Sequence, residues 1–415
     1  MDRIKPGEIP PRYDEVNLGS GGGDGARYGA PWWKNKKVWI GVAAVVVIAI
    51  VIGVAVGVTQ GKKSSYPDYS QLTYTLKDTC EFDLFFSVTF GCSVFVGVYS
   101  THSRLNVDIY LFHNNNANKC SRTTPLVQGE NFFDNFNYYT GYDPAQGFVH
   151  YVPEVEAQRL NLTFASQDAA VLRVDTSVGP KSVPNASTGR FSVRVESKNT
   201  YNDGLFIFDV RHTPTGCGSW PALWLTDPSN WPKNGEIDVM EATNKADDGN
   251  QMTLHTSPSC SMDVKRKQAD KALQDNCDSS KNGNAGCGVQ GETSTFGSAY
   301  NKNGGGIMAM EWRDAGIRVW QFARSAIPSD ITSQKPDPST WGEAAADFPS
   351  TDCNVGNHFR NNSIILNIDL CGDLVYGVWD KSGCSSNCTD IVANNPESFT
   401  DAYWEVGKFQ VYQSS

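Results

Sequence analysis

The sequence predicts an all-β domain, a sandwich or a barrel, preceded by one transmembrane helix. Beyond Gly129, apolar and polar residues alternate in short runs, as in residues 160–164 and 191–195. Gly, Pro, Asn and Asp separate these runs, and residues 310–322 have the pattern of a β-hairpin that turns near Asp314. Few stretches have a long helical period. Many short strands without intervening helices are typical of β-sandwiches and barrels.

The N-terminal elements predict a membrane protein. Residues 1–37 form a low-complexity tail with a Gly-rich patch, which we expect to be disordered and cytosolic. Residues 38–59 are uncharged and proline-free, and the run is about as long as a helix needs to cross a bilayer. It is too long and too far from the start for a cleaved signal peptide. A buried core helix is the less favoured alternative. Basic residues before the run favour a type II orientation, with a cytosolic N-terminus.

Two features after the run agree with this orientation. Residues 60–71 are expected to be a short polar stem, and residues 72–415 a domain that is extracellular or lumenal. Acceptor patterns for N-glycosylation begin at Asn161, Asn185, Asn361 and Asn387. All 11 cysteines also follow the run, in what would be an oxidising compartment.

Residues 80–127 do not fit the β pattern around them. The segment holds three of the cysteines, so that an even number remains outside it. Codons for residues 80–82 can contain the donor-like string GTGAGT, and codons for residues 126–127 an acceptor-like TAG. Removal of the segment keeps the reading frame. One interpretation is a retained intron in the gene model; the alternative is a genuine insertion or a second membrane-active loop.

Composition restricts the class of ligand. The net charge is −10 and no long basic stretch appears beyond the N-terminal third, which excludes nucleic acid as an expected partner. The chain has 11 Trp, 16 Tyr and 20 Phe. An aromatic-rich acidic surface suits a neutral ligand such as a sugar.

The run GEIDVMEA, residues 235–242, places three carboxylates on one apolar strand. Glu236 and Asp238 are two residues apart and share a face, whereas Glu241 would face away in a regular strand. A bulge near Val239 and Met240 would return Glu241 to that face, with the two Glu Cα atoms about 13 Å apart. Their carboxyl groups could then approach to about 5–5.5 Å, the separation in retaining glycosidases. The alternative is a solvated strand face whose acids serve solubility.

Tryptophans crowd the approach to this run. Aromatic faces stack on sugar rings and commonly line open clefts. We predict that Trp224 and Trp231 bind substrate, and that Trp220 is structural.

Three motifs resemble glycoside hydrolase family 16, and in particular its fungal endo-1,3(4)-β-glucanases. They are WPALWL, NGEIDVMEA and LHTSPSC, and the resemblance covers residues 129–412. It implies a concanavalin A-like β-jelly-roll sandwich with a cleft, and a retaining double displacement. By matching position it makes Glu236 the nucleophile, Glu241 the general acid/base and Asp238 the supporting acid. Trp224, Trp231 and His255 match positions that line the cleft.

Other polar residues have weaker assignments. His255 contacts either the substrate or Asp238, or is simply structural. Glu311 is expected on a structural strand, because no second carboxylate lies at a useful spacing, while Asp369 and Asp373 have no assigned place.

The cysteines are expected to form disulfides. The spacing of Cys384 and Cys388 could suggest zinc, but no His accompanies it, so a short disulfide loop between these two is favoured. The remaining six are expected to pair among themselves: Cys217, Cys260, Cys277, Cys287, Cys353 and Cys371. No cofactor is predicted, although some family members hold a structural calcium ion. We expect a monomer.

The leading functional prediction is a membrane-anchored endo-β-glucanase that hydrolyses internal β-1,3 or β-1,4 linkages. A transglycosylase that passes the sugar to another glucan is the related alternative. A non-catalytic glucan-binding protein is the alternative from another class, and the intact acids argue against it.

Overall fold

The structure, a computed structural model, describes residues 66–69, 72–79, 92–101, 104–113, 131–182 and 186–414. For residues 92–101 and 104–113 the backbone alone is described. The predicted tail (1–37) and transmembrane helix (38–59) lie outside these ranges. Among the described residues, no helix combines the length and the apolar character needed to cross a bilayer.

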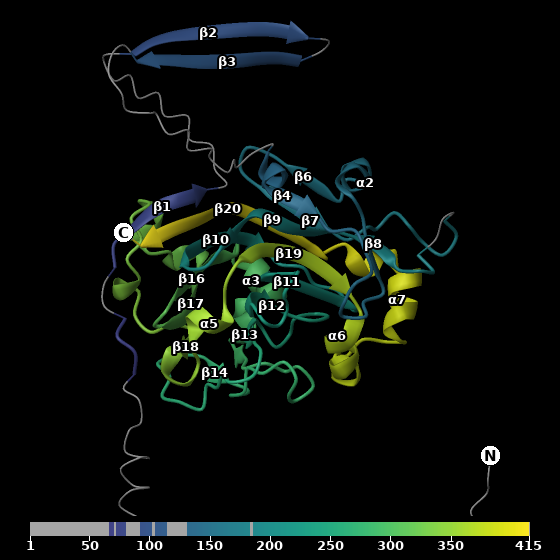
Figure 1. The fold of residues 1–415 in the computed structure, drawn as a ribbon. Helices are drawn as coiled ribbons and strands as arrows, with labels where there is room; N and C mark the ends of the chain where they lie inside the picture. The colour runs from purple at the N-terminus through teal and green to yellow at the C-terminus, as the bar shows by residue number, and fades with distance from the viewer. Residues whose placement is uncertain are drawn as a thin grey trace, which may run out of the picture. The chain divides into compact units, whose positions relative to one another are not determined.

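Two antiparallel sheets form the body of the fold (Figure 1). The first, the β10 sheet, has the order β18 (Ala346–Pro349), β17 (Gly316–Ala323), β16 (Gly306–Arg313), β10 (Gly204–His212), β20 (Tyr403–Ser414), β7 (Ala170–Arg173) and β6 (Thr163–Ala165). Strand β1 (Tyr74–Thr79) pairs with the C-terminal half of β20, and β7 pairs with its N-terminal half. The second, the β12 sheet, has the order β14 (Lys271–Ala272), β15 (Val289–Gln290), β13 (Gln251–His255), β12 (Glu236–Glu241), β11 (Ser219–Thr226), β19 (Asn362–Leu370), β9 (Arg194–Tyr201) and β4 (Phe136–Tyr138).

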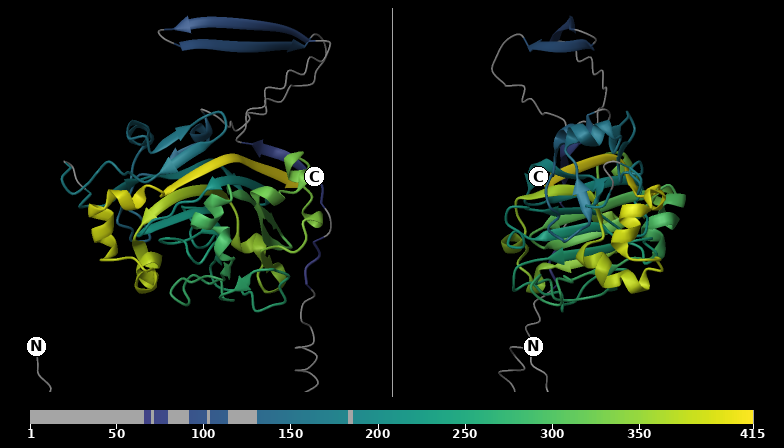
Figure 2. Two further views of the ribbon diagram at one scale, coloured as in Figure 1. Left: turned by 180° about the vertical axis from the view of Figure 1, so that it is seen from behind. Right: turned by 90° about the vertical axis from the view of Figure 1, so that its right-hand side faces the viewer.

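The other elements are short. Strands β2 (Cys92–Thr101) and β3 (Arg104–His113) form a separate hairpin, and β5 (Val149–Tyr151) pairs in parallel with β8 (Arg190–Ser192). The α-helices are α2 (Glu154–Arg159), α3 (Gly297–Lys302), α4 (Ser329–Thr332), α5 (Val355–His358), α6 (Gly372–Val378) and α7 (Cys388–Asn394). The 3-10 helices are η2 (Phe132–Asn135), η3 (Thr293–Thr295), η4 (Arg324–Ala326), η5 (Pro338–Thr340), η6 (Ser350–Asp352), η7 (Trp379–Lys381) and η8 (Pro396–Phe399). Helices α6 and α7 lie together at one end of the sheets (Figures 1 and 2).

The main core lies between the two sheets, which stack as layers in Figure 2. Phe206 and Phe208 of β10 are fully buried in the same cluster as Leu223 and Leu225 of β11. Burial of apolar surface between two sheets is the main force that holds such a sandwich together. The predicted all-β sandwich is therefore confirmed, and its two stacked sheets are consistent with the jelly roll that the resemblance implies.

Local patterns were predicted with mixed success. The hairpin at residues 310–322 is present as β16 and β17, which turn at Asp314 and Ala315. The run 191–195, by contrast, is divided between β8 and β9. In the run 160–164, only residues from Thr163 onward are in a strand, because α2 and its closing turn precede them.

The disulfides correct two predictions. The predicted disulfide between Cys384 and Cys388 is wrong, because each of these residues forms a disulfide with another cysteine. Cys384 bonds Cys217 and Cys388 bonds Cys371, which ties α7 and the loop before it to the β12 sheet. Of the six cysteines expected to pair among themselves, only four do so, as Cys260–Cys353 and Cys277–Cys287. That prediction is wrong for Cys217 and Cys371, which bond the two cysteines near α7. All eight cysteines outside residues 80–127 are thus paired with one another.

Part of the predicted stem contacts the folded domain. Tyr66 donates a hydrogen bond to Asp347 (2.9 Å), and the ring of Tyr69 lies 4.1 Å from the guanidinium of Arg318. Just after the stem, Tyr74 of β1 donates a hydrogen bond to Glu311 (2.6 Å). Asp347 and Glu311 are almost fully buried, so the tyrosines satisfy carboxylates that water does not reach.

Candidate active site

The three acids lie on β12 at a bulge. In the pairing of β12 with β11, Leu223 opposes Met240 and Trp224 opposes Asp238, so Val239 has no partner on β11. The predicted bulge is therefore confirmed. Val239 and Met240 are both fully buried, although neighbours in a regular strand face opposite sides.

The register shows that the acids share one face. Thr226, Trp224 and Ala222 alternate along β11 and so project to the same side. They oppose Glu236, Asp238 and Glu241 respectively. The bulge thus turns Glu241 toward the side occupied by the other two acids.

A buried asparagine closes the bulge. The side-chain oxygen of Asn250 accepts the backbone N–H of Glu241 (3.0 Å), and its Nδ2 donates to the carbonyl of Val239 (3.0 Å). Asn250 is fully buried just before β13. It satisfies the backbone groups on both sides of the extra residue, which the neighbouring strands do not pair.

Asp238 and His255 form a pair between the two glutamates. His255 Nε2 lies 3.4 Å from Asp238 Oδ2 and 4.0 Å from Glu236 Oε1, and Nδ1 contacts the Asn284 side-chain oxygen at 2.9 Å. Burial, followed by the Glu236 carboxylate, raises the pKa of Asp238 well above its usual range. Burial opposes the charged form of His255, but the neighbouring acids prevail and raise its pKa to about 10. His255 is therefore protonated at neutral pH, and its positive charge lies beside Asp238 and Glu236.

The Glu241 carboxyl is buried and has a raised pKa. Burial is the largest influence on this carboxyl and raises its pKa above the ordinary value. The indole N–H of Trp220 donates a hydrogen bond to Glu241 Oε1 at 2.8 Å. This bond stabilises the charged carboxylate and so lowers the pKa of Glu241, against the effect of burial. A carboxyl with a raised pKa can be protonated near neutral pH and donate that proton.

Trp220, which was expected to be structural, contacts the Glu241 carboxyl directly through its indole N–H. Trp220 and Trp224 are four residues apart on β11 and share a face. This spacing was visible in the sequence and could have identified Trp220. No comparable signal existed for Asn250, whose two bonds reach across a turn.

Trp224 and Trp231 lie in different surroundings. Trp224 donates to the side-chain oxygen of Asn367 (2.8 Å), and the Arg194 guanidinium lies 5.0 Å from its ring. This guanidinium also lies 4.7 Å from the ring of Tyr139, so aromatic and basic groups continue the site across β9 and β19. Trp231 is 44% exposed on the loop that precedes β12.

The remaining acids are placed as follows. Glu311 is in the β10 sheet and is held by Arg313 and Arg318, as its structural assignment predicted. Asp369 opposes Trp220 on β19, and burial, followed by Asp143, raises its pKa well above the usual range. Asp373 is exposed in the first turn of α6.

Among the described residues, one group has the spacing of metal ligands. Glu236, Asp238 and His255 each offer an atom within 4.8 Å of the others. The contacts of His255 with Asp238 and Asn284 already engage both of its ring nitrogens. The absence of a cofactor remains a prediction.

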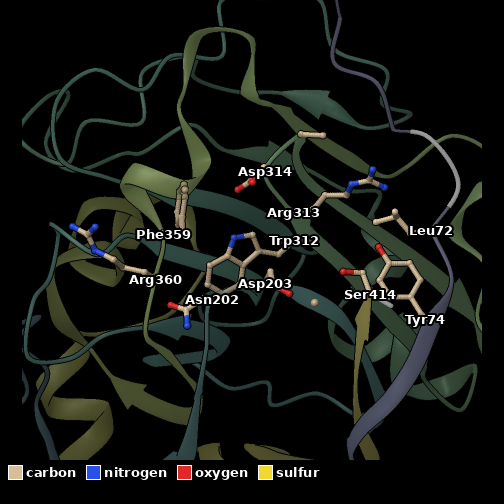
Figure 3. Close-up of a pocket in the computed structure, with 13 residues that line it drawn as sticks. Leu72, Tyr74, Asn202, Asp203, Trp312, Arg313, Asp314, Phe359, Arg360 and Ser414 are labelled. Carbon is tan, nitrogen blue, oxygen red and sulfur yellow. The ribbon is translucent and has the colours of Figure 1, made fainter.

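A separate cavity of about 720 Å³ lies beside the β10 sheet (Figure 3). Its wall includes Trp312 and Arg313 of β16, Asp203 before β10, and Tyr74 of β1. None of the six predicted site residues lines it, so the acids of β12 and not this cavity define the candidate site.

Known proteins resemble the chain over the sandwich. A family model described as the XgeA-like catalytic GH16 domain matches residues 136–412. A probable glycosidase of Schizosaccharomyces pombe is 42% identical over 301 residues, which cover 71% of this chain and 70% of the relative. The chain spans only 39–63% of the length of the endo-1,3(4)-β-glucanases of Aspergillus, Emericella and Arthroderma species that it matches at 36–39% identity.

Two solved structures are similar in both fold and sequence. Laminarinase 16A from Phanerochaete chrysosporium, with β-glucans in its donor and acceptor sites, is 41% identical with a TM-score of 0.65. The match covers 69% of this chain and 97% of that chain. An elongating family 16 β-1,3-glucosyltransferase is 36% identical with a TM-score of 0.64, over 69% of this chain and 98% of that chain.

Proposed function

Since the chain belongs to glycoside hydrolase family 16, as an XgeA-like catalytic domain, we propose that it is an endo-acting, retaining β-glucanase. Its substrate is a β-glucan, in which it hydrolyses internal β-1,3 or β-1,4 linkages. The bulge in β12, which turns Glu236, Asp238 and Glu241 to one face, is the observation that carries this proposal. The relatives described as endo-1,3(4)-β-glucanases support the substrate class.

The first half of the reaction uses both glutamates. Glu236 attacks the anomeric carbon as a carboxylate and forms a glycosyl-enzyme ester. Glu241 gives its proton to the glycosidic oxygen as that bond breaks, so the shortened glucan leaves as a neutral alcohol. Burial raises the pKa of Glu241, which favours the protonated form that this step needs.

The second half reverses the role of Glu241. As a carboxylate, it removes a proton from water while the water oxygen attacks the anomeric carbon and releases Glu236. Two displacements restore the β configuration. Asp238 lies between the glutamates, and the charge contact with His255 makes the site less negative than a third unpaired carboxylate would.

Hydrolysis of two contrasting glucans tests this function. The purified full-length chain, in detergent, is incubated with laminarin or lichenan and the products are sized. We expect a rapid fall in polymer length with a range of oligosaccharides, which is the mark of internal cleavage. A monosaccharide released from an unshortened polymer would contradict the endo mode, and two unaltered polymers would contradict the function.

Transglycosylation is the second candidate, favoured by the similarity to the elongating β-1,3-glucosyltransferase. It uses the same glycosyl-enzyme, but a glucan hydroxyl replaces water in the second step. A labelled acceptor oligosaccharide in the same incubation separates the two. Label that appears in longer products identifies transfer.

Replacement of Asn250 by Asp should impair turnover by moving Glu241. Aspartate has no N–H for the Val239 carbonyl and places a carboxylate oxygen beside it. We expect kcat on laminarin to fall by about 10- to 100-fold, since small displacements of a catalytic group have effects of this size. KM should change little. Steady-state kinetics measure both constants.

Asn244→Asp is the matched control. Asn244 is also buried, and its side-chain oxygen also accepts a backbone N–H, that of Gly218 (2.9 Å). The hydrogen bond of the Asn244 side chain is to the loop before β11, whereas the Asn250 side chain bonds the bulge in β12. A fall in kcat as large as that of Asn250→Asp would show that any buried Asn→Asp change disturbs turnover, and would refute the role of Asn250.

We propose a type II membrane location for the enzyme, with the catalytic domain extracellular or lumenal. The apolar run at residues 38–59, the basic residues before it and the four glycosylation patterns after it support this. The disulfide pairs support an oxidising compartment. Protease protection of the N-terminal tail in sealed vesicles tests the orientation.

For residues 80–127 we propose a retained intron. The reading frame survives removal, and the eight cysteines outside the segment pair without it. Strands β2 and β3 within the segment pair with each other and belong to neither of the two large sheets. Sequencing of the mature transcript tests this. A message that still encodes residues 85–118 contradicts it.

A further inference from the structure

We propose that Trp220 is a positioning residue for the acid/base Glu241, with an indole N–H that aims the carboxyl at the glycosidic oxygen. This inference rests on the proposed function, because it gives Trp220 a task within the same reaction.

The contact between the two residues is direct. The indole N–H donates to Glu241 Oε1 at 2.8 Å, within the range of a strong hydrogen bond to a carboxylate. Among the described residues, no other hydrogen bond to the Glu241 carboxyl is found. Its backbone N–H is held separately by Asn250. Trp220 therefore fixes the side chain, while Asn250 fixes the main chain.

Trp220 is itself held rigidly. It opposes Asp369 in the pairing of β11 with β19. A β-carbon added at Gly372 would lie only 3.0 Å from the indole ring, so the ring packs directly on the backbone at the start of α6. The Cys371–Cys388 disulfide anchors that backbone. A rigid donor loses little freedom when it orients a catalytic group.

The neighbouring tryptophan serves as an internal comparison. Trp224 projects from the same face of β11, but its indole N–H bonds the amide oxygen of Asn367 and no acid. Replacement of either tryptophan by Phe keeps an aromatic ring and removes one N–H. Trp220→Phe therefore removes the hydrogen bond to Glu241, whereas Trp224→Phe removes the hydrogen bond to Asn367.

The loss of the donor should alter the pH dependence in a defined direction. An N–H donated to a carboxylate stabilises the charged form, so its removal raises the pKa of Glu241 further. The charged groups that face Glu241 are Glu236 and Asp238 from β12 and His255 from β13, and all remain in the variant. Because the first step needs protonated Glu241, the alkaline limb of kcat/KM should move to higher pH.

The test uses Trp220→Phe in the full-length chain with laminarin as substrate. We expect kcat/KM to fall by about 10- to 100-fold at neutral pH, the usual effect of a lost hydrogen bond to a charged group. On a laminaribioside with a dinitrophenolate leaving group, which departs without a proton, the glycosylation rate should fall much less. Trp224→Phe should raise KM and leave the alkaline limb in place.

Two further measurements distinguish the loss of the Trp220–Glu241 hydrogen bond from a general disturbance of the fold. In a Glu241→Gln background, Trp220→Phe should cause little additional loss, because the two residues act as a unit. Titration of a ¹³C-labelled Glu241 carboxyl by NMR detects the shift without any turnover. It therefore tests the contact even if the proposed function fails.

Opposite outcomes would overturn the inference. An unmoved Glu241 titration in Trp220→Phe excludes the hydrogen bond as a determinant of the acid. Equal losses on laminarin and on the activated substrate would assign Trp220 to ring packing alone. Trp220 would also be assigned to ring packing alone if Trp220→Phe melted at a much lower temperature and its loss of activity added to that of Glu241→Gln.

Discussion

Glu236→Gln is expected to abolish hydrolysis of β-glucan while binding of the polymer is retained. The carboxamide has nearly the same shape as the carboxylate but cannot form the glycosyl ester, so kcat should fall by about 10³-fold or more. Release of reducing ends from laminarin measures turnover, and affinity electrophoresis in a laminarin gel measures binding.

Glu311→Gln provides the control for this change. Glu311 is a buried glutamate in the other sheet, where it pairs with Arg313 and Arg318. Its replacement should lower the melting temperature, because it breaks a buried ion pair, but the folded fraction should still hydrolyse glucan. Hydrolysis by Glu236→Gln at the unaltered rate would refute its assignment as nucleophile.

Glu241→Ala is expected to have the second largest effect, and one that depends on the leaving group. Loss of the acid should reduce kcat on laminarin by about 10²- to 10⁴-fold, the usual contribution of general acid catalysis. A substrate with a dinitrophenolate leaving group should still form the glycosyl-enzyme rapidly, because this group needs no proton. The ester should then accumulate, since no base remains to activate water.

Azide distinguishes the two glutamates by product. In Glu241→Ala it can enter the vacated space and displace the ester carboxylate, which gives a β-glycosyl azide by a second inversion. In Glu236→Ala it would replace the nucleophile itself and give the α product. NMR of the anomeric proton identifies each. An α-azide from Glu241→Ala would show that the two roles have been assigned the wrong way round.

Much of the site could be predicted because one strand encodes it. The period of a β-strand placed Glu236 and Asp238 on one face, and the apolar residues between the acids required a bulge to bring Glu241 beside them. The hydrophobic pattern likewise predicted the sandwich, because alternation reports burial on one face of a sheet.

Contacts between distant parts of the chain could not be predicted in this way. The bonds of Asn250 depend on how a turn folds back on the bulge, and no local pattern specifies it. The pairing of Cys384 with Cys217 depends on the position of α7 beside β11, whereas spacing alone favoured its near neighbour Cys388. The contacts of Tyr66 and Tyr69 with the β10 sheet were missed for the same reason.

Strand β20 contacts the residues on both sides of the segment 80–127. Thr79, which precedes the interrupted region, pairs with Gln410, while the ring of Phe132 lies 5.4 Å from that of Phe409. The two sides of the interruption therefore dock on consecutive residues of a single strand. Without residues 80–127, only residues 128–131 would join Thr79 to Phe132, an ordinary length for a loop between neighbouring elements. A chain that lacks the segment could therefore keep both contacts with β20, so the retained-intron proposal requires no change in the pairing of that strand.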